Sequence, residues 1–481
     1  LANASDDARG RDPGHVLIGA GLGTFETAIG FAPTLPARLL RLAGRLGLGG
    51  YALAIALVSA SVLGAAGWAL HAAGASLAQL LSLAPLALLP ATEAASALVN
   101  LCVTRGITPA PLPSLELSTG VPPNLRTFVA VPVLLTGPDD LSEHLERLEV
   151  HHLSSVGGAL HYALLSDGLD ATHETIGTDA SLIALAEAGI ARLNAAYPTS
   201  AGNRFLLLHR RRRWNPSEGC WMGWERKRGK LVELNRLLRG DDGTSFLPSV
   251  VAVPQDVRFV ITLDADTRVP RDAVRRLIGK LAHPLNRPRF DAVQGRIVEG
   301  YGILQPRVTA ALPIGQEGSV FQRISSSPGG IEPYAAAISD VYQDLFGEGS
   351  FTGKGIYDID AFEAALMGRV PNNSMLSHDL FEGIFARAAL ASDVEVVEDF
   401  PARYDVAARR QHRWVRGDWQ LFPWVFGRRR GGVPTLGRWK MADNMRRSLV
   451  VPLAALALGA GWLSPLPLAS LSTVLVIAML T

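Results

Sequence analysis

The sequence predicts an α/β domain with a mostly parallel sheet, flanked at both ends of the chain by transmembrane helices. Between about residues 124 and 426, short β-rich runs alternate with amphipathic stretches, which favours a parallel sheet covered on both faces. The mean hydropathy is +0.19 although 19% of the residues are charged, and the apolar excess lies at the two ends of the chain. Such a distribution is typical of a membrane protein with a soluble middle.

The composition excludes several classes of protein. A net charge of +2 and a pI near 8.6 are too small to indicate nucleic-acid binding. Cys102 and Cys220 lie far apart without CxxC spacing, so neither a disulfide framework nor a zinc site is supported. The polar start of the chain lacks a signal-peptide pattern. Both ends of the chain, Leu1 and Thr481, look like cuts through a longer protein.

A transmembrane hairpin is predicted near the start of the chain. Residues 51–75 contain no Asp, Glu, Lys or Arg, and that length spans a hydrocarbon core of roughly 30 Å as a helix. A second apolar stretch follows at 77–102, interrupted by Pro85, Pro90 and Glu93. We expect Glu93 to lie near the membrane interface rather than to face a partner helix. The alternative for the first stretch is a buried core helix.

Basic residues predict the orientation of the hairpin. Arg38, Arg41 and Arg45 precede it and Arg105 follows it, and such residues concentrate on the cytoplasmic side. The same rule places the residues after Arg105 in the cytoplasm. The predicted organisation is a cytoplasmic N-terminal segment with an amphipathic basic stretch (1–48), a transmembrane hairpin (49–104), a cytoplasmic domain (105–427), a basic juxtamembrane segment (428–447) and transmembrane helices (448–481), the second of them truncated.

Four strands are expected in the soluble middle, together with amphipathic helices. The strands are 126–135, 161–167, 204–210 and 257–266. An amphipathic helix lies between the first two strands, and another follows the fourth. Ligands collect at the carboxyl ends of strands in such sheets. Asp167, Asp264 and Asp266 are all predicted there.

Asp264 and Asp266 form the first candidate site. They follow the apolar run VITL, and strand alternation would send both side chains to one face. Paired carboxylates can bind Mg²⁺ or Mn²⁺ and leave coordination positions for phosphate oxygens. Plain surface charge is one alternative. A haloacid-dehalogenase-type phosphatase is another, but that pattern needs Thr or Val where Arg268 stands.

A basic segment forms the second candidate site. Lys227, Arg228 and Lys230 surround Gly229 just before a predicted helix, and they could hold a diphosphate together with the helix N-terminus. The alternative is a solvated basic turn. The preceding arginine run 210–213 is expected to be a solvated or membrane-facing patch rather than part of a site.

Three further segments carry chemistry. Asp379 precedes an amphipathic stretch and is either a helix cap or a general base, and we expect the neighbouring His378 to be structural. The loop 347–355, GEGSFTGKG, would let a substrate approach the backbone closely. The Arg- and Trp-rich segment 409–424 could bind a sugar, and the alternative is an interfacial aromatic belt.

Seven segments in this order resemble a processive family 2-type glycosyltransferase, most closely the glycosyltransferase domain of the bacterial cyclic β-1,2-glucan synthases. They are FVAVPVLLTG, ALLSDG, WERKRGKLVELN, FVITLDADTRVP, GEGSFTGKGIYDIDAF, LSHDLFEG and RQHRWVRGDWQ. The resemblance covers about residues 126–424. It implies a GT-A-type (nucleotide-diphospho-sugar transferase) fold for 105–427 and a multi-pass protein of the bacterial inner membrane, in contact with lipid.

The resemblance also implies roles for the donor-side residues. Asp167 would contact the uracil of UDP-glucose. Lys227, Gly229 and Lys230 would line the nucleotide and diphosphate. Asp264 and Asp266 would hold the Mg²⁺ or Mn²⁺ ion that bridges the diphosphate.

On the acceptor side, the resemblance makes Asp379 the general base of an inverting, in-line transfer of glucose to a growing β-glucan. Gly353, Gln411, Arg413 and Trp414 would bind the acceptor chain. Related synthases have Gln-x-x-Arg-Trp here, whereas only His412 separates Gln411 from Arg413, which leaves the role of Gln411 open.

The alternatives for the whole protein are another processive β-glycan synthase or a non-catalytic carbohydrate-binding module of the envelope. Complete synthases of the family also carry a C-terminal phosphorylase-like domain, and this chain would be a fragment or truncated relative.

Overall fold

Two sets of residues, each with its own internal contacts, make up the chain in the computed structural model. Unit 1 comprises Leu1–Phe31, Pro111–Asp340 and Glu348–Arg410, and unit 2 comprises Ala32–Ala110, Val341–Gly347 and Gln411–Thr481. The structure describes residues 8–107, 112–155, 157–199, 202–311, 318–325, 340–427 and 432–480. Arginines 428–430 of the predicted juxtamembrane segment lie outside the described residues.

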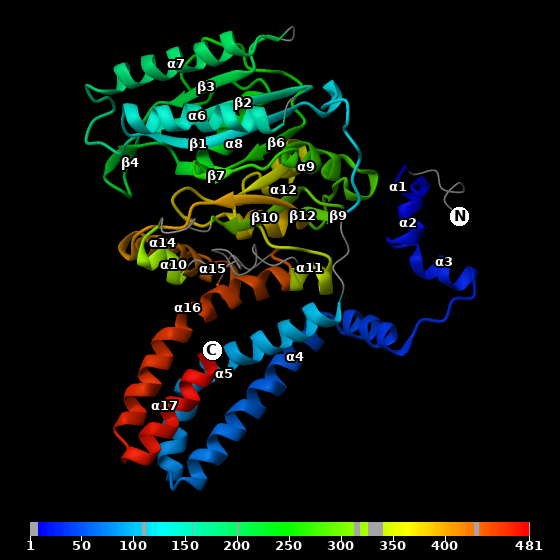
Figure 1. Ribbon diagram of the computed structural model, residues 1–481, viewed down its shortest axis with the longest axis vertical. Helices are drawn as coiled ribbons and strands as arrows, with labels where there is room; N and C mark the ends of the chain where they lie inside the picture. Colours follow the sequence, from blue (N-terminus) through cyan, green and yellow to red (C-terminus); the bar gives the residue numbers. More distant parts are fainter. Residues whose placement is uncertain are drawn as a thin grey trace. The chain divides into compact units, whose positions relative to one another are not determined.

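An eight-stranded sheet forms the centre of unit 1, in the order β3-β2-β1-β6-β11-β10-β12-β7 (Figure 1). The first half is parallel: β3 (Phe205–Arg210), β2 (Leu160–Gly168), β1 (Thr127–Leu135) and β6 (Phe259–Thr262). In the second half, β11 (Gly355–Asp358) is antiparallel to β6 and to β10 (Ile303–Ala310), β12 (Ala388–Glu398) is parallel to β10, and β7 (Thr267–Arg268) is antiparallel to β12. The first three predicted strands are confirmed. The sheet as a whole is mixed.

Helices cover both faces of this sheet. On one face, apolar residues of α6 (Pro138–Ser154), α7 (Asp179–Ala196) and α9 (Ala273–Ala282) share a single core cluster with the strands. Ile356 of β11 belongs to that cluster, whereas its neighbour Tyr357 donates a hydrogen bond to Asn235 of α8 (Arg226–Leu238) at 2.9 Å. Because successive strand residues point to opposite faces, α8 packs on the other side.

Smaller elements complete unit 1. They are α1 (Ala8–Arg11), α2 (Pro13–Leu17), α3 (Leu22–Ala28), the hairpin β4 (Arg213–Asn215) and β5 (Cys220–Met222), the hairpin β8 (Arg289–Asp291) and β9 (Arg296–Glu299), α10 (Val320–Ser325), α12 (Ile359–Leu366) and α13 (Asp379–Phe385), with short 3-10 turns at Pro123–Leu125 and Pro284–Asn286. The helix α14 (Tyr404–Gln420) begins in unit 1 and ends in unit 2.

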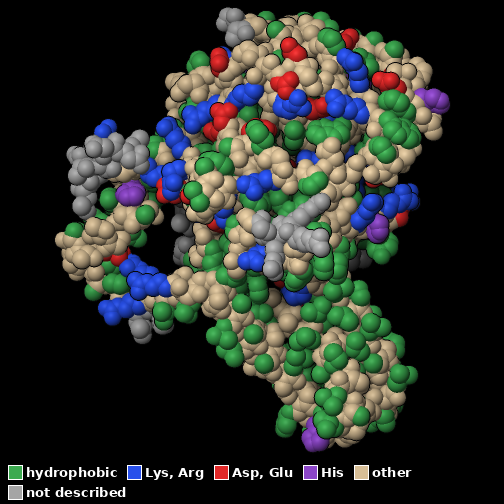
Figure 2. All heavy atoms as spheres, turned by 180° about the vertical axis from the view of Figure 1, so that it is seen from behind, with side chains coloured by type: hydrophobic (Ala, Val, Ile, Leu, Met, Phe, Trp, Pro, Cys, Tyr) green, Lys and Arg blue, Asp and Glu red, His purple; other side chains and the backbone are tan. Residues whose placement is uncertain are grey.

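Unit 2 is helical. Its helices are α4 (Leu35–Ala72), α5 (Leu77–Gly106), α11 (Val341–Phe346), α15 (Phe422–Val425), α16 (Thr435–Trp462) and α17 (Leu466–Leu480). Two stretches, Gly44–Ala72 and Leu77–Gly106, are long and apolar enough to cross a membrane by length and composition. Many of their apolar side chains are exposed, for example Trp68 at 75% and Leu77 at 70%. Figure 2 shows that the surface of the helical part of the molecule is almost free of charged side chains.

The helix boundaries in unit 2 match several expectations and correct others. A capping box between Ser76 and Gln79 starts α5 at Leu77, where the second apolar stretch was predicted to begin. The predicted transmembrane segment 448–481 contains the end of α16 at Trp462 and the whole of α17 from Leu466. Pro85 and Pro90, however, lie inside α5 and do not interrupt it.

Glu93 faces a partner helix, which was the alternative interpretation, and its position relative to the membrane interface stays a prediction. Its Oε2 lies 2.8 Å from Nη2 of Arg446 on α16, and Arg446 also donates a hydrogen bond of 3.2 Å to Oγ1 of Thr92. The two helices pack against each other, and an ionised group on such a surface is stabilised by a partner on the facing helix. Glu93 therefore joins α5 to α16.

Candidate active site

Asp264 and Asp266 lie in a turn and not on a strand, which corrects the predicted strand 257–266. The strand β6 ends at Thr262, and the turn is closed by Thr267, whose backbone N–H donates to the Asp264 carbonyl and whose Oγ1 accepts from the Asp264 N–H, both at 3.1 Å. Strand alternation is therefore not what brings the two carboxylates together. The turn does so.

Glu398 completes a cluster of three carboxylates with Asp264 and Asp266, which we call the open cluster. It is paired with Thr267 in the register of β12 and β7. One carboxylate oxygen of each residue lies within 4.8 Å of the others. A donor set made only of carboxylate oxygens suits Mg²⁺ or Mn²⁺, so these residues fit the predicted cation.

Two lysines lie against the open cluster. Nζ of Lys227 is 2.5 Å from Oδ1 of Asp264 and donates to the carbonyl of Gly353 at 2.8 Å. Nζ of Lys354 lies 2.6 Å from Oε1 of Glu398 and 3.4 Å from Oδ2 of Asp264. Sequence reasoning missed Lys354 and Glu398. The only available signals were a lysine between two glycines and a carboxylate at the end of an apolar run.

The charges around the open cluster act differently on its members. Burial alone would raise the pKa of Asp264, but Lys227 and Lys354 outweigh it and lower that pKa. Burial raises the pKa of Asp266, and the carboxylates of Glu398 and Asp264 add to the rise. The Asp266 carboxylate thus lacks the compensation that Asp264 has, and a bound cation would supply it.

Asp379 lies beside the same group of residues, at the start of α13, with its side chain 31% exposed. Gly353 has a φ of +87°, and a Cβ built on it would lie 2.7 Å from Oδ1 of Asp379. The loop backbone therefore approaches this carboxylate as closely as only glycine allows. Since the Gly353 carbonyl accepts from Lys227, the structure brings Asp264, Lys227 and Asp379 to one place.

His378 is buried next to Asp379. Its Nδ1 lies 2.8 Å from Oε1 of Glu382 and 3.4 Å from Oδ1 of Asp379. Burial alone would lower the pKa of His378, but Glu382 and Asp379 outweigh it and raise that pKa. The histidine thus contacts the candidate base directly.

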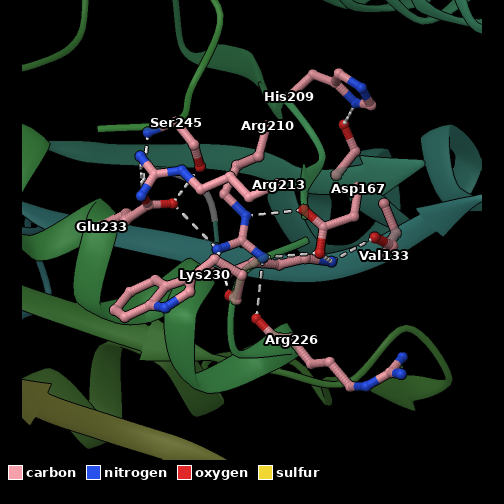
Figure 3. A network of polar contacts seen from close by, with 11 residues as sticks. Val133, Asp167, His209, Arg210, Arg213, Arg226, Lys230, Glu233 and Ser245 are labelled. Carbon is pink, nitrogen blue, oxygen red and sulfur yellow. Dashed lines mark hydrogen bonds and ion pairs between the residues drawn. The ribbon is translucent and has the colours of Figure 1, made fainter. Parts of the chain in front are cut away.

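Asp167 belongs to a second group, shown in Figure 3 and called here the closed network. Arg210 donates from Nε to one Asp167 oxygen at 2.8 Å and from Nη2 to the other at 2.9 Å. Lys230 lies 3.2 Å from Asp167 and donates to the carbonyl of Val133 at 2.6 Å. Burial would raise the pKa of Asp167, but Arg210 and Lys230 lower it. Its contact with uracil stays a prediction.

The expectation that residues 210–213 form a solvated patch was wrong for two of the arginines. The Arg210 side chain is 0% exposed, and that of Arg212 is 4% exposed and pairs with Asp179. Arg210 ends a strand whose six residues are all buried. A buried guanidinium needs carboxylate partners, and Asp167 at the end of the neighbouring strand provides one.

The basic segment is the first turn of α8 and not a turn before it. The helix begins at Arg226, so Lys227 and Lys230 lie three positions apart on one side. Lys227 reaches Asp264, and Lys230 reaches Asp167. Gly229 is packed inside: a Cβ there would lie 1.9 Å from the Trp224 carbonyl.

The predicted acceptor residues are divided between the units. Gly353 belongs to unit 1, whereas Gln411, Arg413 and Trp414 lie on the part of α14 that belongs to unit 2. Gln411 and Arg413 are exposed, and Trp414 is half-buried. Their role at an acceptor stays a prediction.

Comparison with known proteins finds one relationship over most of the chain. No protein-family model matches. The cyclic beta-(1,2)-glucan synthase NdvB of Rhizobium meliloti (strain 1021) is 47% identical over 460 residues. The aligned region is 94% of this chain but 16% of that protein, so the chain corresponds to a limited part of its relative.

Proposed function

Because the chain is related to the cyclic β-(1,2)-glucan synthases over nearly its whole length, we propose that it is a membrane-bound glycosyltransferase of glucan synthesis. Its donor is UDP-glucose, its acceptor is a growing β-1,2-glucan, and the transfer inverts the anomeric configuration. The GT-A-type fold is part of the proposal, supported by parallel strands with acidic residues at their carboxyl edge.

One observation carries the proposal. Three carboxylates, two lysines and a separate, partly exposed carboxylate at Asp379 lie around the backbone of Gly353. Transfer from a nucleotide sugar needs a positive site for the leaving diphosphate and a base for the acceptor hydroxyl. A module that only binds carbohydrate needs neither.

The open cluster would serve the leaving group. Asp264, Asp266 and Glu398 would hold Mg²⁺ or Mn²⁺, which when bound neutralises charge on the diphosphate. Lys227 and Lys354 add positive charge beside it. These lysines stabilise UDP as the bond between the anomeric carbon and the diphosphate oxygen breaks.

Asp379 would serve the acceptor. Its side chain is 31% exposed, so an acceptor hydroxyl can reach the carboxylate. The acceptor oxygen attacks the anomeric carbon from the side opposite UDP and transfers its proton to Asp379. A single displacement of this kind needs one base and no carboxylate nucleophile.

The membrane setting is also proposed. Gly44–Ala72 and Leu77–Gly106 would cross the bacterial inner membrane, with α16 and α17 contributing further helices. The arginines before α4's apolar part and after Cys102 favour a cytoplasmic unit 1, where nucleotide sugars are available.

Membranes from cells that express the protein would test the function. We expect label from radiolabelled UDP-glucose to enter a glucan with Mg²⁺ or Mn²⁺ and not with EDTA. Asp379→Asn should abolish incorporation, while Asp256→Asn, at a carboxylate 93% exposed, should not. Sugar binding that ignores UDP and metal in calorimetry, with no incorporation, would support a binding module instead.

A further inference from the structure

The entry into α8 is strained. Glu225 and Arg226 are consecutive, neither is glycine, and their φ values are +51° and +49°. Residues with a Cβ rarely adopt this left-handed region, and such strain persists only where surrounding contacts hold it. Lys227, which contacts the open cluster, is the next residue along the chain. The direction of its side chain therefore depends on what holds this turn.

Arg210 holds the turn from both sides. Its Nη1 donates to the carbonyl of Trp224 at 3.0 Å, and its Nη2 donates to the carbonyl of Arg226 at 3.1 Å. These two carbonyls bracket the strained pair. Gly229 leaves the space for this approach, since a Cβ on it would be 3.0 Å from Nη1 of Arg210.

The guanidinium is itself fixed. Besides the two carbonyls, it donates to both oxygens of Asp167 and, at 3.1 Å, to Oε2 of Glu233. Glu233 in turn accepts from the backbone N–H of Ser245 at 3.0 Å and from its hydroxyl at 2.5 Å. The five hydrogen bonds that Arg210 donates, two to Asp167, one to Glu233 and two to the backbone carbonyls, use all five N–H groups of its guanidinium. A lysine has three donors on one atom and cannot reproduce the fork.

We propose that Arg210 is a positioning residue for the donor diphosphate: it clamps the left-handed entry to α8 and thereby directs Lys227 toward Asp264 and the Gly353 carbonyl. Arg210 acts through Lys227 and need not touch the substrate. This inference rests on the proposed function for its kinetic consequence, but its structural consequence can be measured without activity.

A double-mutant cycle tests the kinetic consequence. Arg210→Lys keeps the charge and loses the fork, and we expect kcat/KM for UDP-glucose to fall about tenfold, a change typical of lost positioning. In a Lys227→Met background the same substitution should change kcat/KM less than about twofold, because the group that it positions is gone. Equal factors in both backgrounds would overturn the proposal. Arg211→Lys, at the exposed neighbouring arginine, is the matched control.

A second variant tests the proposal in case Arg210→Lys alone folds poorly. Glycine adopts positive φ without a steric penalty, so Arg210→Lys combined with Arg226→Gly should regain most of the lost kcat/KM. The side chain of Arg226 has one exposed ion pair, with Asp170 at 2.9 Å, which contributes little. A double variant that folds and stays as impaired as Arg210→Lys would count against the clamp.

Chemical labelling separates this inference from the proposed function. In the folded protein, Nζ of Lys227 is held by Asp264 and Gly353. Mass spectrometry should show faster acylation of Lys227 in Arg210→Lys than in the wild type or in Arg211→Lys, because the amine is released from these two contacts. If the wild type were inactive but labelling of Lys227 still became faster in Arg210→Lys, the proposed function would be wrong and the positioning role of Arg210 would be supported. Unchanged labelling would sink the clamp alone.

Discussion

The open cluster with its two lysines and the closed network both bring carboxylates and cationic side chains together near the carboxyl ends of parallel strands. They differ in how completely the charged groups are buried and paired with one another. In the closed network, Asp167 and Glu233 are at most 4% exposed in their side chains and share an arginine with all of its donors used. In the open cluster, Asp264 is 32% exposed, and the pKa of Asp266 is raised. The first group is complete without a ligand. The second is not.

This difference separates two uses of buried charge. A network whose donors and acceptors all have partners fixes geometry. A partly exposed cluster with unbalanced charge can change partners when a cation or an anion arrives. Substitutions in the open cluster should therefore lower activity and spare the fold, whereas substitutions in the closed network should lower stability.

The largest expected effect is at Asp379. Asp379→Asn keeps the size of the side chain and removes its basicity, so kcat should fall about 10³-fold with an unchanged thermal unfolding midpoint. Steady-state incorporation of glucose and thermal unfolding in detergent check both parts. Retention of more than about a tenth of the activity would exclude this carboxylate as the base, given the range for general bases.

Next is Asp264→Asn. The substitution weakens the predicted cation site and leaves two lysines without their shared carboxylate, so we expect kcat/KM to fall about 100-fold and the Mg²⁺ or Mn²⁺ concentration for half-maximal activity to rise. Titrating the metal against activity measures this. Asp242→Asn, at an exposed carboxylate, is the control. An unchanged metal requirement would show that the cation is held elsewhere.

In the closed network, Glu233→Gln should act on stability. It removes one of two carboxylates from a fully buried guanidinium, and breaking such a group costs about 3 kcal/mol. Denaturant unfolding should show this loss, whereas Glu187→Gln on the exposed side of α7 should leave stability unchanged. If Glu233→Gln proved as stable as the wild type, the closed network would not stabilise the fold.

The smallest effect is a pH dependence from Lys230. Burial lowers the pKa of Lys230 from 10.5 to about 8, although Asp167 acts in the opposite direction. Between these values the unfolded chain binds more protons than the folded one, so stability should rise with pH across that window. Relative to Lys230→Met, the wild type should gain about 2.5 kcal/mol between pH 8 and 10.5. Parallel curves for both proteins would show that Lys230 titrates normally.

Local patterns predicted much of unit 1. Short β-rich runs located β1, β2 and β3, and the helical spacing of Val274, Leu277, Ile278 and Leu281 located α9, where all four are buried. Asp264, Lys227 and Asp379 were predicted as site residues from the short segments around them, and the structure brings these three together. Each of these signals lies within a short segment of the chain.

The residues that the sequence did not predict owe their roles to contacts with residues far away in the sequence. Glu398 meets Asp264 through the pairing of β12 with β7, and Arg210 meets Glu233 across the start of α8. The end of β6 at Thr262 depends in the same way on the turn that Thr267 closes. Periodicity carries no information about such pairings, so the run of arginines looked like solvated charge.

The spacing of Lys227 and Lys230 has a consequence for how this region can vary. Each lysine reaches a different carboxylate group, and both stand on one turn of the same helix. Inserting a single residue between them would rotate one side chain by about 100° relative to the other, so no insertion could preserve both contacts. The first turn of α8 therefore fixes the spacing between the open cluster and the closed network.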